Sequence, residues 1–263
     1  MRRWLAAAAA IVVAGTVAGC EPGEPSPEPC SEPDQPEGRP GQAAPLLSLG
    51  GPSGTRGATQ VLYEDGWVLT QEAADADGPA AVRPMYAGPV YDDDPRVWRS
   101  SYVGACEIEQ VRELAAETFV EGIEFGSPTV TDMPSTTMTW YGDGKPVEVS
   151  AYALGHEGEY DGTSRDERAA RERLHVLIEL LDAGVATGDV APTGYLRVAR
   201  LGSEIEDPPD WPGPPTAELL ADQECGRIDG EDAVVVHDHL LAGGQAPEGV
   251  WIAVGPIGVE PCP

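Results

Sequence analysis

The chain has little positive charge. Lysine and arginine together number 16 against 45 aspartates and glutamates, and the formal net charge at pH 7 is -29. Binding to nucleic acid needs clustered lysine and arginine, so this composition excludes a nucleic-acid-binding protein. The same charge opposes docking of a folded domain onto anionic lipid.

Catalytic motifs are missing as well. No Gly-x-Ser-x-Gly elbow is present, and His156-Glu157 is not followed by the second histidine of a zinc-protease helix. No glycine-rich phosphate loop precedes a helix. We therefore expect a protein that is not an enzyme and uses no cofactor, with an unrecognised hydrolase as the open alternative.

The N-terminus carries the clearest signal. Two arginines precede an apolar run over residues 4–17, which is too short for a comfortable membrane span. This order is typical of a signal peptide, here residues 1–19. The motif ending in Ala18-Gly19-Cys20 resembles the lipobox of bacterial lipoproteins. The resemblance implies a diacylglycerol on the Cys20 sulfur, which anchors an extracytoplasmic protein in the outer leaflet of the cytoplasmic membrane.

Residues 20–45 are rich in proline and glutamate and hold no large apolar side chain. Such a segment cannot bury enough surface to fold, so we expect a disordered, extended tether of about 60–75 Å. A proline-rich ligand for a partner is the alternative. Residues 46–263 suit a single globular domain, and a division into two lobes stays open.

Short alternating runs around Asp-Gly turns predict two β-hairpins in the globular part. Apolar spacing predicts helices over 106–120 and, after an Asp229 cap, over 230–242. A third helix lies between a capping box at Ser164 and a stop at Gly184. Without regular βαβ spacing, these elements predict an α+β fold with a mostly antiparallel sheet and two or three packed helices. The expected strands are 46–49, 60–63, 67–69, 97–103, 136–141, 147–152, 195–201 and 250–254.

Three blocks of sequence stand out: TDMPSTTMTW at 131–140, VSAYALG at 149–155 and CGRIDGEDA at 225–233. With the lipobox, they resemble a family of uncharacterised actinobacterial secreted lipoproteins. The resemblance covers most of residues 46–263 and implies export and a shared fold. Members of that family have no assigned activity, so the resemblance supplies no site residues.

Four cysteines follow Cys20, and an even number in an exported chain predicts two disulfides with three possible connectivities. A helix packed on the terminal strand brings Cys225 and Cys262 together, so we pair these two. Cys30 in the flexible tether can then reach Cys106 at the start of its helix. No Cys-x-x-Cys pair indicates zinc.

Candidate metal ligands are weak. His237 and His239 have suitable chemistry, but two helical positions this close point about 200° apart. The acidic run of Asp92, Asp93 and Asp94 can recruit weak Ca²⁺. For both groups a solvated surface is the favoured interpretation, so we expect no metal site.

Trp211 lies in a proline-rich loop over 204–216. An exposed tryptophan there can anchor a partner, and it can equally pack back onto the domain. Taken together, the sequence predicts a membrane-anchored, non-enzymatic lipoprotein that binds an envelope protein, peptide or polymer. A small-solute or cation-binding receptor is the alternative.

Overall fold

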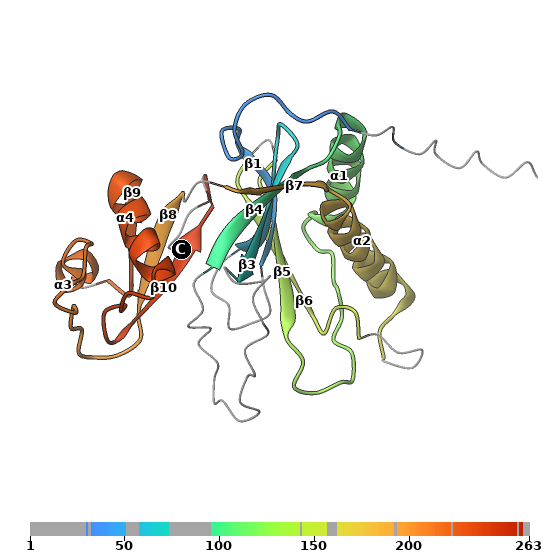
Figure 1. Ribbon diagram of the computed structural model, residues 1–263. Coiled ribbons are helices and arrows are strands. Elements are labelled where there is room, and N and C mark those ends of the chain that lie inside the picture. The colour runs from blue at the N-terminus through green and yellow to red at the C-terminus, as the bar shows by residue number, and fades with distance from the viewer. Residues whose placement is uncertain are drawn as a thin grey trace, which may run out of the picture.

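Figure 1 shows the computed structural model of the chain, which describes residue 30 and residues 33–50, 58–73, 96–142, 144–156, 162–191, 194–221, 223–256 and 258–259. Helices and strands alternate irregularly along this part of the chain. None of the helices described there is long and apolar enough to cross a membrane.

Two antiparallel sheets form the framework. The larger has seven strands in the order β6-β5-β1-β2-β3-β4-β7, and the smaller has three in the order β10-β8-β9. The predicted α+β fold with a mostly antiparallel sheet is therefore confirmed. The large sheet consists of β1 (Pro45–Gly50), β2 (Ala58–Tyr63), β3 (Trp67–Ala73), β4 (Arg96–Tyr102), β5 (Ser135–Trp140), β6 (Val147–Tyr152) and β7 (Val185–Val190). The small sheet consists of β8 (Tyr195–Arg200), β9 (Cys225–Asp229) and β10 (Val250–Gly255), and the helices are α1 (Ala105–Thr118), α2 (Arg165–Asp182), α3 (Thr216–Leu220) and α4 (Gly230–Leu241).

The predicted turn between β2 and β3 forms around Asp65 and Gly66. The Asp65 side chain accepts a hydrogen bond from the Trp67 backbone N–H at 3.3 Å. Gly66 has a φ of 94°, in the region that favours glycine, and a Cβ there would lie 2.6 Å from the Val103 carbonyl oxygen. The turn conformation and the close approach of the Val103 carbonyl thus both require glycine at position 66.

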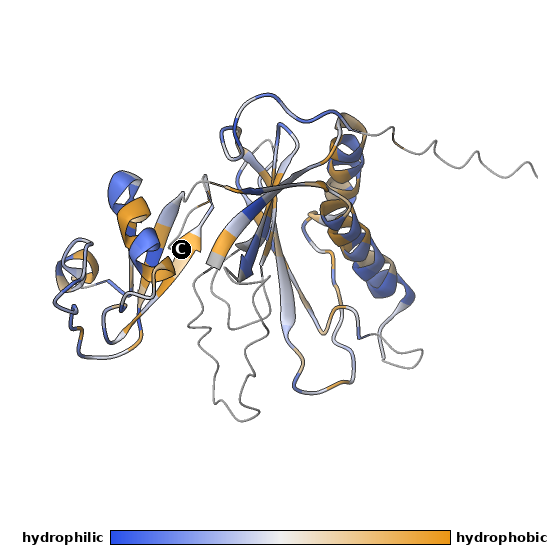
Figure 2. Cartoon of the chain, viewed as in Figure 1, coloured by the Kyte–Doolittle hydropathy of each residue, from blue (hydrophilic) through white to orange (hydrophobic). Residues whose placement is uncertain are grey.

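Helices α1 and α2 cover one face of the large sheet (Figure 1). The predicted capping box at the start of α2 is present: the Ser164 hydroxyl accepts from the Glu167 backbone N–H at 3.2 Å, and the Glu167 carboxylate accepts from the Ser164 backbone N–H. Both helices carry hydrophobic and hydrophilic residues in alternating stripes (Figure 2). The apolar stripe of α2 (Ala170, Leu174, Leu177, Leu181) packs with Leu47, Leu62, Val68 and Met138 of the sheet.

The opposite face of the large sheet meets the small sheet. A second core joins Val61 and Leu69 of the large sheet to Leu196, Val198 and residues of α4. The Trp98 indole N–H also donates to the Val254 carbonyl of β10 at 3.1 Å. The small sheet with α3 and α4 is therefore a second lobe that shares its core with the first.

Three elements were absent from the sequence-based expectation: β7, β9 and α3. Most residues of β7 are exposed, so no apolar alternation marks it. Helix α1 ends at Thr118, before the predicted Val120. Asp229 does occupy the N-cap position of α4, but its side chain makes no capping hydrogen bond and instead pairs with Arg227. Arg227, two residues earlier on the same strand, competes with the first backbone N–H groups of α4 for the Asp229 carboxylate.

Residues 33–45 lie against the domain, although their composition predicts an extended tether. Ala43 packs against the second core, and the Ala44 carbonyl accepts from the Glu64 backbone N–H at 3.0 Å. Pro33 lies so close to Gly104 that a Cβ there would meet its ring at 2.9 Å. These contacts hold the described part of the predicted tether to the domain.

Candidate functional site

On the face opposite α1 and α2, strands β1, β5 and β6 present a row of hydroxyl side chains. Alternation along β5 sends Met138 into the core beneath the helices, so its neighbours Thr137 and Thr139 point to the other side. Pairing places Thr139 beside Ser48, and Thr137 beside Ser150. We call this set the hydroxyl face: Ser48, Ser135, Thr137, Thr139 and Ser150.

The strand register shows why this face is polar. One row of paired residues crosses the sheet through Glu148, Thr139, Ser48, Val61 and Leu69. The last two are fully buried in the core shared with the small sheet. The row changes from apolar to polar at Ser48, beyond the residues that pack in this shared core.

The hydroxyl face is open to solvent on its outer side. Ser150 and Glu148 on the edge strand β6 are exposed, and Thr137 and Thr139 are partly exposed. Ser48, on the side nearest the small lobe, is buried. The face thus grades from an exposed edge to a covered inner end, with hydroxyl groups throughout.

Tyrosines line the inner end. The Tyr141 hydroxyl lies 3.3 Å from Ser48 Oγ, and burial raises the pKa of Tyr141 despite this hydrogen bond. Burial likewise raises the pKa of Tyr63, and raises the pKa of Tyr195 to about 12. These phenols stay neutral at physiological pH, so they serve as hydrogen-bond donors and acceptors and not as bases.

A cation lies beside this tyrosine group. The Arg227 guanidinium carbon is 4.6 Å from the centre of the Tyr195 ring, a cation–π contact, and its Nε pairs with Asp229. Arg227 also lowers the pKa of Tyr195, against the larger effect of burial. The inner end therefore combines neutral hydroxyls with an ion pair, and Arg197 also lies near enough to lower the pKa of Tyr195.

Of the weak candidate metal ligands, the structure describes only His237 and His239. His237 is buried, while His239 is partly exposed and meets the edge of Trp211, with ring centres 6.2 Å apart. Asp92, Asp93 and Asp94 lie outside the described residues. Among the residues that are described, no group of three histidine, cysteine or acidic side chains is placed to hold a metal ion.

Trp211 takes the second of the two placements that the sequence allows. Its indole N–H donates to the Pro214 carbonyl at 3.0 Å, and its ring packs against the second core. A Cβ at Gly213 would meet that ring at 2.9 Å, so the loop is closely fitted around it. A partner-binding role for Trp211 stays a prediction.

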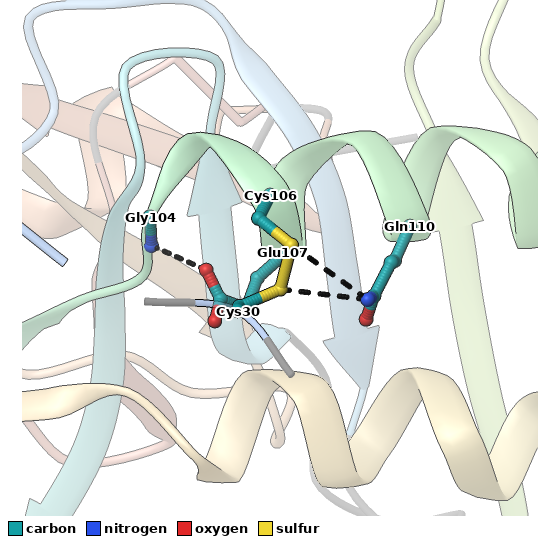
Figure 3. The surroundings of a disulfide bond; sticks show 5 residues. All are labelled: Cys30, Gly104, Cys106, Glu107 and Gln110. Atoms are coloured by element: carbon teal, nitrogen blue, oxygen red, sulfur yellow. Dashed lines mark hydrogen bonds between the residues drawn. A yellow bond between two sulfur atoms is a disulfide. The ribbon is translucent and has the colours of Figure 1, made fainter. Parts of the chain in front are cut away.

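The predicted disulfide between Cys30 and Cys106 is confirmed, with a Cα–Cα distance of 5.7 Å (Figure 3). Cys225 is also disulfide-bonded. Cys262, its predicted partner, and the predicted lipidation site Cys20 lie outside the described residues, so both assignments stay predictions.

The sequence reasoning missed the hydroxyl face, although its signal is present. Ser135, Thr137 and Thr139 alternate along one hairpin strand, but only the pairing with β1 and β6 shows that the hydroxyls gather on one side. Comparison with known proteins finds no match to the chain among family models, curated proteins or solved structures.

Proposed function

We propose that the protein is a lipid-anchored, extracytoplasmic binding module. Its hydroxyl face binds an envelope polymer whose backbone is uncharged and rich in hydroxyl and amide groups, such as the glycan strands of peptidoglycan. The observation that carries this proposal is the open sheet face with at least four hydroxyl side chains, three of them partly or fully exposed, on neighbouring strands: Ser48, Thr137, Thr139 and Ser150.

The form of this face suits a polymer better than a small solute. It lies on a sheet and runs out to the edge strand β6, so a long ligand can continue past the protein. Hydroxyl groups both donate and accept hydrogen bonds, which matches the alternating groups of a sugar or peptide chain. The net charge of -29 disfavours an anionic polymer.

Two features support the anchored location. The lipobox-like motif predicts lipid on Cys20, and the Cys30–Cys106 disulfide suits an oxidising compartment outside the cytoplasm. The segment from Cys20 to Cys30 spans about 30 Å when extended. The lipid would therefore hold the domain closer to the membrane than a tether reaching to residue 45 would.

The anchor is tested by fractionation of the Cys20→Ala variant in an actinobacterial host. We expect it to leave the membrane fraction after salt and carbonate washing, because the acyl chains supply the attachment. Persistent membrane association of the washed variant would contradict lipid anchoring.

Binding is tested by co-sedimentation of the mature chain, without its lipid, with purified peptidoglycan. Replacing Thr137 and Thr139 together by valine keeps side-chain shape and removes two hydroxyls, so we expect binding about tenfold weaker. Thr136→Val is the matched control, since Thr136 points to the helix side of the same strand. Equal binding by the parent, the double variant and the control would refute the role of the hydroxyl face.

A further inference from the structure

The Cys30–Cys106 disulfide lies at the surface, beside a side-chain hydrogen-bond donor. Cys106 is exposed in the first turn of α1, and Cys30 is partly exposed. The Gln110 side-chain amide lies 3.4 Å from Cys30 Sγ and 3.8 Å from Cys106 Sγ (Figure 3). An external thiol can therefore reach the bond, and one N–H donor serves both sulfurs.

This setting favours one direction of bond cleavage. A cysteine in the first turn of a helix is stabilised as a thiolate by the free backbone N–H groups, and Gln110 adds a side-chain donor. Glu107 acts in the opposite sense: its carboxylate lies nearby and accepts from the Gly104 backbone N–H at 3.0 Å. Cys106 is thus the better leaving group, and Cys30 the sulfur that is attacked.

We propose that the Cys30–Cys106 disulfide is a thiol–disulfide exchange site for an extracytoplasmic protein dithiol. A thiolate of the dithiol attacks Cys30 Sγ, the bond between the two sulfurs breaks, and Cys106 leaves as a thiolate that takes up a proton. The second thiol of the dithiol then displaces Cys30 from the mixed disulfide. Two electrons pass to the protein, which gains two thiols, and the dithiol becomes a disulfide.

Opening this bond leaves the folded cores in place. All buried members of both cores lie at or after Leu46, and only the partly buried Ala43 belongs to the preceding segment. The covalent attachment between the N-terminal segment and α1 is lost, while the contacts of Pro33 and Ala44 remain. If the lipid anchor of the proposed function holds, exchange lengthens the reach of the domain from the membrane.

The exchange is tested on the oxidised mature chain treated with thioredoxin or dithiothreitol. Alkylation at timed intervals and peptide mass analysis follow each cysteine, with Cys225 as the internal reference. We expect Cys30 and Cys106 to become reduced about tenfold faster than Cys225 while the folded-state spectrum is retained. Reduction of all the cysteines at one rate, or only after unfolding, would overturn the proposal.

Two variants test the mechanism in opposite directions. Gln110→Leu removes the donor and should slow reduction about threefold, whereas Glu107→Gln removes the charge, keeps an acceptor for Gly104 and should accelerate it. Unchanged rates in both variants would also overturn the proposal. The reduction rates are measured without lipid or peptidoglycan, so a negative result would overturn the exchange site and leave the proposed function standing. Negative results in the membrane or peptidoglycan assays would overturn the proposed function and leave the exchange site standing.

Discussion

Arg171 offers the sharpest test of how the first lobe is held together. Its side chain lies in the apolar stripe of α2 and is only 1% exposed. The guanidinium donates to the carbonyl of Phe125 at 3.0 Å and to those of Tyr152 and Ala153 at 2.9 Å. One buried cation thus joins the helix, the segment after α1 and the end of the edge strand β6.

The cost of removing this cation follows from the groups it leaves behind. Each buried carbonyl that loses its hydrogen-bond donor costs about 1–3 kcal/mol of stability. Three carbonyls lose their donor here, and partial relaxation of the surrounding structure makes the total cost smaller than three times this value. Methionine fills a similar volume, so a cavity adds little. We therefore expect Arg171→Met to lower the free energy of unfolding by about 3–5 kcal/mol.

Urea unfolding of the parent and variants measures this difference. Arg171→Lys should recover less than half of the loss, because a single ammonium cannot match the fork of a guanidinium to separate acceptors. Arg165→Met is the matched control: Arg165 is exposed in the first turn of the same helix, where loss of a positive charge is neutral or slightly favourable. A loss of unfolding free energy below about 1 kcal/mol for Arg171→Met would refute this role of Arg171.

Further predictions concern pH, cross-linking and metal. Burial raises the pKa of Tyr195 from its ordinary value of 10.0 to about 12. The neutral Tyr195 therefore contributes its full share to the free energy of unfolding below pH 10.0, and this contribution is lost as the pH rises towards 12. Tyr195→Phe should flatten this decline in urea titrations, and an unchanged slope would contradict it. Non-reducing peptide mapping should link Cys225 to Cys262, and a peptide joining Cys225 to Cys20 would refute that pairing. Ca²⁺ or Zn²⁺ should leave the Tm nearly unchanged, and a chelator-reversible rise of many degrees would show a tight site.

Local signals were enough to predict the strands and helices of the first lobe except β7. The turn at Asp65-Gly66 and the capping box at Ser164 determine backbone geometry within a few residues, and the structure contains both. The apolar stripe of α2 then predicts which side meets the sheet. The Cys30–Cys106 pair followed by elimination, after Cys225 was paired with Cys262 and Cys106 was placed at a helix start.

Tertiary context determined what the sequence did not reveal. Strand β7 has no buried alternation, because it lies at the sheet edge and is held by pairing with β4. The capping role expected of Asp229 failed because Arg227, on the same strand, takes up the carboxylate. Composition also does not reveal that a disulfide holds Cys30 to the domain or that Pro33 packs against Gly104.

The Cys30–Cys106 disulfide and the hydroxyl face lie on opposite sides of one sheet. Cys106 belongs to α1, which covers the helix side of the large sheet, whereas Thr137 and Thr139 point to the other side. A domain held to the membrane through Cys30 therefore need not cover its own hydroxyl face. Because Ser48 is buried near the small lobe and Ser150 is exposed at the strand edge, a polymer would enter from the β6 side. Substitution of Ser150 should consequently weaken peptidoglycan binding more than substitution of Ser48 does. A larger loss of binding from the Ser48 substitution would place the ligand elsewhere.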